Sequence, residues 1–138
     1  RVVIVATPEM LRLHGRPTHP SELADIPCII DTNVSYRANW PFEESGKRFS
    51  VQVKGRLEVD SPNVARRAAL HDIGFAIVPW LVVRDDLAAG RLVEVLSDFE
   101  PAGVGIFAVY PHRRHLSGKV RAFVDYMVEF FKNAESNC

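Results

Sequence analysis

Residues 59–95 constrain the fold most, because a strand end, a helix, a strand, a second helix and a further strand follow one another there with clear boundaries. A polar residue within 60–63 can cap a helix whose first turn accepts Pro62, since proline gives up an N–H group that has no partner inside the helix. The helix is expected to run to about His71. Gly74 is expected to end it in the left-handed conformation.

The second half of this stretch repeats the pattern. Residues 75–78 form a short apolar run that Pro79 stops, which is typical of a buried parallel strand. A second short helix is predicted over 81–89, ending at Gly90, and residues 92–96 resume an apolar run. Strands and helices that alternate over such short connections predict an α/β fold.

The first thirty residues are predicted to fold in the same way. Residues 2–6 are continuously apolar, as in a strand buried on both faces, and Thr7 can cap a helix that Gly15 closes. A helical turn is predicted over 21–23 and a strand over 28–30.

From Asn39 onward the apolar period changes to two. Trp40 and Phe42 alternate with polar residues, residues 44–47 can turn, and the alternation resumes over 49–53. This pattern predicts a β-hairpin with one solvent-facing side. The alternation continues from there toward the stretch that begins at residue 59.

The end of the chain is predicted to form a linker over 97–103, a buried strand over 104–110, a loop over 111–116 and a helix that Ser117 caps. The helix has apolar residues at spacings of three and four, which form one wide stripe that needs a partner sheet: Val120, Phe123, Val124, Met127, Val128 and Phe131.

Composition excludes several classes of protein. With 138 residues, 47% of them hydrophobic, the chain can bury a core, and 17 basic against 17 acidic residues leave no net field to attract nucleic acid or an anionic membrane. The two cysteines lack zinc or redox spacing, and no apolar run is long enough to span a bilayer. We therefore expect a cytoplasmic protein without membrane contact. Because Arg1 leads directly into a strand, we also expect a longer parent polypeptide.

Catalytic and cofactor motifs are weak. Residues 103–108 match the glycine fingerprint of dinucleotide sites, but these glycines precede a strand, whereas the mechanism needs the strand first. His112 and His115 lack the further ligands that zinc requires. Asp85 and Asp86 point about 100° apart on a helix, so they are expected to start or solvate it. No serine, cysteine or lysine stands in a nucleophile context, so we predict no enzyme, no metal site and no cofactor.

The helix start at residues 61–64 carries the remaining binding chemistry. Free N–H groups at a helix start can hold a carboxylate, sulfate or phosphate. Capping by the neighbouring side chains explains the same residues more simply. The residues alone leave both interpretations open.

Three runs of the sequence resemble the effector-binding domain of LysR-type transcriptional regulators. They are ATPEMLRLHGRPTHPSELADIPCI, LHDIGFAIVPWLVVRDDLAAGRLVEVL and VYPHRRHLSGKVRAFVDYMVEFF, and in this order they span almost the whole chain. The resemblance implies a fold like that of type 2 periplasmic binding proteins, in which two α/β lobes joined by two crossing strands enclose a small-molecule pocket. It implies one complete lobe here, plus the carboxy-terminal part of the other.

Three segments follow from the resemblance. Residues 1–6 correspond to the first interlobe crossing, 7–100 to the second lobe, and 101–138 to the second crossing and the carboxy-terminal part of the first lobe. The family's amino-terminal winged helix-turn-helix and most of the first lobe have no counterpart in this chain. DNA binding is therefore expected only through that winged helix-turn-helix, in the full-length protein.

The resemblance also implies an effector site between the lobes. Its residues come from the loop after residue 59, the strand over 75–78 and the two crossings: Ala6, Thr7, Asp60, Ser61, Pro62, Asn63, Phe75, Ala76, Ile77, Phe107 and Ala108. A helix start that faces this cleft favours an anionic ligand by about 0.3–1 kcal/mol.

The expected function is therefore a ligand-sensing regulatory domain. It would bind a small organic effector, form dimers or tetramers in the full-length protein, and change lobe or dimer geometry to control transcription. The alternative is a periplasmic-type solute-binding protein without DNA-binding function, which should carry a secretion signal.

Overall fold

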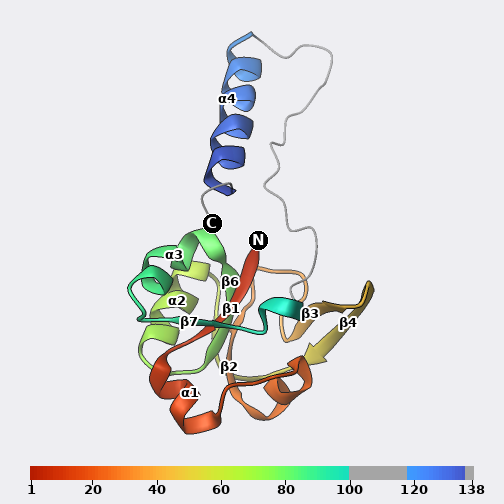
Figure 1. Ribbon diagram of the computed structural model, residues 1–138, viewed down its shortest axis with the longest axis vertical. Helices are drawn as coiled ribbons and strands as arrows, with labels where there is room; N and C mark the ends of the chain where they lie inside the picture. The colour runs from red at the N-terminus through yellow and green to blue at the C-terminus, as the bar shows by residue number, and fades with distance from the viewer. Residues whose placement is uncertain (100–117, 136–138) are drawn as a thin grey trace. The chain divides into compact units, whose positions relative to one another are not determined.

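The computed structural model describes residues 1–99 and 118–135 (Figure 1). The chain divides into two compact units, Arg1–Val104 and Gly105–Cys138. The predicted strand over 104–110, the loop over 111–116 and the helix cap at Ser117 lie outside the described residues, as does most of the predicted linker.

The first unit is built on a mixed five-stranded sheet with the strand order β5-β2-β6-β1-β7. Its strands are β1 (Val2–Ala6), β2 (Pro27–Asp31), β5 (Lys54–Val59), β6 (Phe75–Pro79) and β7 (Val93–Val95). β2 is parallel to β5 and to β6, whereas β1 runs antiparallel to both of its neighbours, β6 and β7. The predicted strands over 2–6, 28–30 and 75–78 are thus confirmed, and the last is parallel to β2 but antiparallel to β1.

Different elements cover the two faces of this sheet (Figure 1). Helices α2 (Pro62–Leu70) and α3 (Trp80–Ala88) pack on one face, where Ala65, Ala69 and Val83 meet the strand residues Val3 and Ile29. The other face is covered by helix α1 (Pro8–His14), the 3-10 turn η1 (Pro20–Asp25) and the hairpin of β3 (Asn39–Glu44) and β4 (Lys47–Gln52). Strands β1, β2 and β6 inside the sheet therefore need apolar side chains on both faces, which explains their continuous apolar runs.

Local signals set most of the element boundaries. The Thr7 hydroxyl accepts a hydrogen bond from the Met10 N–H at 3.2 Å and caps α1, and Gly15 follows the helix with φ 81°. Ser45 and Gly46 have φ values of 50° and 77°, as a two-residue type I′ turn requires, and this turn joins β3 to β4. The predicted cap, helix end and hairpin are confirmed.

The prediction that Gly74 ends α2 in the left-handed conformation is wrong. Asp72, with φ 59°, is the left-handed residue after α2, whereas Gly74 has no positive φ. Gly74 instead packs against the neighbouring strand, because a Cβ atom there would lie 2.6 Å from the carbonyl oxygen of Pro27. The position needs glycine for close backbone approach and not for its freedom in φ.

Strand β5 separates from the hairpin that precedes it. The alternating pattern predicts only that a strand continues toward residue 59, but β5 pairs in parallel with β2 and forms the outer strand of the central sheet. Its residues are exposed from Lys54 through Glu58.

The second unit contains helix α4 (Gly118–Glu135), so the predicted final helix is confirmed from residue 118 onward. Along its described side chains, several large apolar residues are exposed, including Phe123 at 63% and Tyr126 at 64%. In the part of the chain that the structure describes, no helix combines the length and the apolar character that crossing a membrane requires.

Candidate functional site

The strand register places the predicted effector residues that the structure describes toward two opposite edges of the sheet. We call the edge where β2, β5 and β6 end the carboxyl edge, and the edge where they begin the amino edge. Val2 pairs with Pro79 at the carboxyl edge, and Val5 pairs with Ala76 near the amino edge. Thr7 therefore lies about 16 Å from Val2 along the strand direction. Residues 60–63 follow the end of β5 and belong to the carboxyl edge.

The predicted residues of β1 and β6 serve the packing of the sheet. Ala6 and Phe75 are fully buried near the amino edge, Ala76 is fully buried under the helices, and Ile77 is buried on the opposite face. Thr7 caps α1 and also donates a hydrogen bond to the Asp72 carboxylate. These contacts occupy the side chains inside the first unit.

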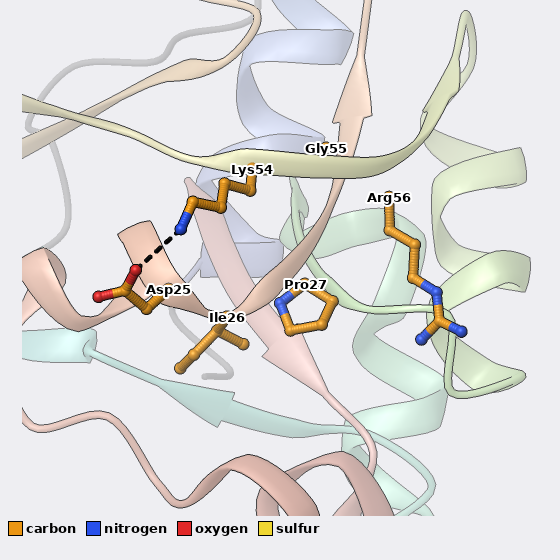
Figure 2. Close-up of a pocket in the computed structure, with 6 residues that line it drawn as sticks. All are labelled: Asp25, Ile26, Pro27, Lys54, Gly55 and Arg56. Atoms are coloured by element: carbon orange, nitrogen blue, oxygen red, sulfur yellow. Dashed lines mark hydrogen bonds and ion pairs between the residues drawn. The ribbon is translucent and has the colours of Figure 1, made fainter.

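The amino edge carries a shallow pocket of about 300 Å³ (Figure 2). Figure 2 shows Pro27 and Ile26 between an Asp25–Lys54 ion pair on one side and the Arg56 side chain on the other. The ion pair has an N–O distance of 2.9 Å, and both of its side chains are largely exposed, so it contributes little stability. None of the predicted effector residues lines this pocket.

The carboxyl edge presents the start of α2. Ser61 occupies the N-cap position, but its side chain makes no capping hydrogen bond, and Pro62 has no N–H group to donate. The first intrahelical bond runs from the Ala65 N–H to the Ser61 carbonyl oxygen at 2.9 Å. The N–H groups of Asn63 and Val64 therefore point out of the helix start without a cap from Ser61. The structure thus lacks the capping by Ser61 that the sequence allows.

A buried acidic residue, Asp31, lies beside this helix start. Thr32 follows it and donates to the Val59 carbonyl oxygen through its N–H at 2.7 Å and its hydroxyl at 3.0 Å, which ties the end of β2 to the end of β5. Asp31 itself is only 6% exposed and accepts a hydrogen bond from the Asn33 N–H at 2.9 Å. Burial, and then the negative charge of Asp31, raise the pKa of Tyr36.

Sequence reasoning did not single out Asp31. The signal was present, because the acidic side chain directly follows the apolar run over 28–30. A charged residue at the end of a buried strand has to find a partner or solvent at the edge of the sheet.

The chain enters and leaves the sheet toward the carboxyl edge. β1 starts there, where the Trp80 N–H donates to the Arg1 carbonyl oxygen at 3.0 Å. β7 runs antiparallel to β1, and its last residue, Val95, pairs with Ile4. β1 therefore starts at this edge and β7 runs toward it, and the same edge carries Asp31 and the start of α2.

The rest of the predicted chemistry can be placed only in part. Phe107 and Ala108 lie outside the described residues, as do His112 and His115. Within residues 1–99 and 118–135, no three side chains of the metal-binding types gather in a metal-binding geometry.

Comparison with known families and relatives gives a consistent result. The model of the LysR substrate binding domain matches residues 1–132. The HTH-type transcriptional regulator PtxR of Pseudomonas aeruginosa is 34% identical over 127 residues, which are 92% of this chain and 41% of the relative. The HTH-type transcriptional regulator DmlR of Escherichia coli is 29% identical over 131 residues, 94% of this chain and 42% of the relative. The chain thus spans about two fifths of the length of these relatives.

Solved structures agree with the sequence matches. The regulatory domain of CrgA, a LysR-type transcriptional regulator from Neisseria meningitidis, has a TM-score of 0.75 at 25% identity, covering 94% of this chain and 63% of that one. Full-length AphB, a virulence activator from Vibrio cholerae, has a TM-score of 0.70 at 27% identity, covering 94% of this chain and 44% of that one. LysR regulatory domains have the type 2 periplasmic-binding-protein-like fold, so this predicted fold class is confirmed.

Proposed function

This chain belongs to the LysR substrate binding domain family, and from that membership we propose that it is the effector-sensing part of a bacterial transcription regulator. The family match over nearly the whole chain is the observation that carries the proposal. The relatives named above are transcription regulators, which supports a regulatory and non-catalytic role.

We propose the same three segments as the sequence resemblance implies: residues 1–6 as the first crossing, 7–100 as the second lobe, and 101–138 as the second crossing with the carboxy-terminal part of the first lobe. The direction of β1 and β7 supports this arrangement, because β1 starts at the carboxyl edge and β7 runs toward it. A cleft between lobes would then be bounded by that edge.

The effector is proposed to bind at the carboxyl edge. Asp60, Ser61, Pro62 and Asn63 are the predicted residues that lie there, and the uncapped start of α2 supplies N–H groups for an anionic group. The proposal gives Ala6, Thr7 and Phe75 a packing role, since they lie near the other edge. Phe107 and Ala108 remain proposed contacts from the second crossing.

Effector binding would act by changing the angle between the lobes. A ligand that touches both lobes binds one angle more tightly than another, and it shifts the population by that difference in affinity. In the full-length protein this change would alter how dimers or tetramers hold DNA, through an amino-terminal winged helix-turn-helix. We propose a cytoplasmic location on the same grounds.

A periplasmic-type solute-binding protein would share the fold but would act by capture alone. The names of the relatives favour a regulator. The reading frame upstream of Arg1 discriminates between the two, because a regulator requires a DNA-binding segment and a solute-binding protein requires a secretion signal.

Thermal unfolding of the full-length gene product, with a panel of small organic acids, tests the proposal. A ligand at one hundred times its Kd stabilises the protein by about 2.7 kcal/mol, so at least one acid is expected to raise Tm by several degrees. Ser61→Asp places a carboxylate on the same N–H groups, so it is expected to cap the helix start and to weaken binding. Arg56→Gln, at the amino edge, is the matched control and should leave binding unchanged.

Two results would contradict the proposal. The absence of any stabilising acid would argue against the function. Weaker binding in Arg56→Gln, with normal binding in Ser61→Asp, would place the effector at the other edge of the sheet.

A further inference from the structure

We infer that the effector carries a hydrogen-bond donor, either an ammonium or a hydroxyl group, beside its anionic group, and that Asp31 accepts a hydrogen bond from this donor. The inference rests on the proposed function and names the chemical class of its ligand. It follows from the incomplete hydrogen bonding of Asp31 and from the position of this residue next to the start of α2 at the carboxyl edge.

The first feature is the incomplete hydrogen bonding of Asp31. A carboxylate has two oxygens and accepts about four hydrogen bonds, and burial makes unpaired capacity costly. Asp31 is only 6% exposed, yet within the described residues its side chain accepts a single hydrogen bond, from the Asn33 N–H to Oδ1. Asp31 therefore keeps acceptor capacity that the described residues leave unused.

The second feature is the position of Asp31 relative to α2. Side chains alternate along a strand, so Asp31 shares the face of Ile29. Ile29 packs in the same cluster as Ala65 and Ala69 of α2. Because the ends of β2 and β5 are joined through Thr32 and Val59, Asp31 lies on the α2 side of the sheet, next to the end where α2 begins.

One ligand can bind both the start of α2 and Asp31, and a simple anion cannot. The helix start attracts a carboxylate, whereas Asp31 repels it and accepts only from a donor. The exposed Asp60, which follows β5, adds a second negative charge to this edge. An acid with an ammonium or hydroxyl group next to its carboxylate meets the N–H groups with one end and Asp31 with the other.

Matched acids that differ at one carbon test this inference. The probes are propionate, lactate and alanine, and the four-carbon series succinate, malate and aspartate, titrated calorimetrically into the full-length gene product. In the series that binds, the donor-bearing members are expected to bind at least about tenfold more tightly than the acid without a donor.

Asp31→Asn assigns that difference to one residue. It keeps an oxygen for the Asn33 N–H and removes the charge, so an ammonium-bearing effector should lose its tenfold advantage, whereas a hydroxyl-bearing effector should keep part of it. Glu58→Gln removes an exposed charge from the neighbouring strand and is the matched control, with an expected change of less than about twofold.

The outcomes separate this inference from the proposed function. Equal binding with and without the donor in the wild-type protein would overturn the inference and leave the function standing, and this comparison needs no variant. Tighter binding of the donor-bearing acids that persists in Asp31→Asn would also overturn the inference. If no organic acid binds at all, both fail.

Discussion

At the scale of single residues, Asp86 is a fully buried carboxylate that binds two arginines. The sequence suggests that Asp85 and Asp86 start or solvate a helix, and this is wrong for Asp86, whose side chain is fully buried. Its carboxylate accepts hydrogen bonds from Nε of Arg66 and, at 2.8 Å, from Nε of Arg91. The residue therefore joins α2, α3 and the loop before β7.

Replacing Asp86 with Asn should lower the free energy of unfolding by about 2–3 kcal/mol. This loss is smaller than the cost of leaving a fully buried charge without a partner. The side chains of Arg66 and Arg91 are partly exposed, so water can hydrate them in the variant. Asp85→Asn, on the exposed side of the same helix, is the control and should change stability by less than about 0.5 kcal/mol. Urea denaturation measures both, and equal effects of the two substitutions would show that the burial of Asp86 carries no stability.

Acid should remove the contribution of Asp86. The hydrogen bond from Arg66, followed by that from Arg91 and the charges of both arginines, holds the pKa of Asp86 below its ordinary value of 3.8, although burial acts in the opposite direction. Between the folded and the unfolded pKa, the unfolded chain binds more protons, so stability rises with pH in that window. The contribution is complete above about pH 5 and disappears as the pH falls through the folded pKa. Asp86→Asn should therefore show a shallower loss of stability below pH 4, and an unchanged slope would contradict the assignment.

At the scale of elements, Gly74 shows why the packing of α2 against β2 needs a glycine between α2 and β6. Gly74→Ala should destabilise the fold by about 1–3 kcal/mol, because the added Cβ meets the backbone of Pro27, which cannot rotate away. Gly118→Ala is the control: a Cβ there meets nothing within 4 Å, and alanine favours the helix. Thermal unfolding of the two variants decides the point, and a neutral Gly74→Ala would mean that β2 can shift to make room.

The boundaries of the helices and strands show over what distance along the chain local sequence signals act. Caps, prolines and the Ser45–Gly46 turn act over a few residues, so the elements and most of their ends are predictable from the sequence. Strand pairing depends on contacts between distant segments. Nothing in residues 54–59 indicates that β5 leaves the hairpin to pair with β2, and nothing in residues 2–6 indicates that β1 runs antiparallel between β6 and β7.

At the scale of the whole molecule, strand direction decides which predicted site residues lie together. The order of residues along the chain places Thr7 and Ser61 equally well beside a cleft. Only the register, with Val2 opposite Pro79, assigns them to opposite edges of the sheet. The helix start at Ser61 was predictable from its capping residues, whereas Asp31 becomes a candidate only when its burial and its position beside α2 are known.

The apolar surface of α4 leads to a prediction for the isolated chain. Large side chains on this helix are exposed, among them Phe123, Tyr126 and Phe130, and exposed apolar area of this kind drives association. We expect the 138-residue chain alone to self-associate at micromolar concentration. Replacing Phe123 and Phe130 with Ser should reduce that association, whereas Glu129→Gln on the same helix should not. Sedimentation velocity measures the association and circular dichroism checks that the helix persists. A compact, monodisperse wild-type monomer would mean that α4 buries its apolar residues within a single chain.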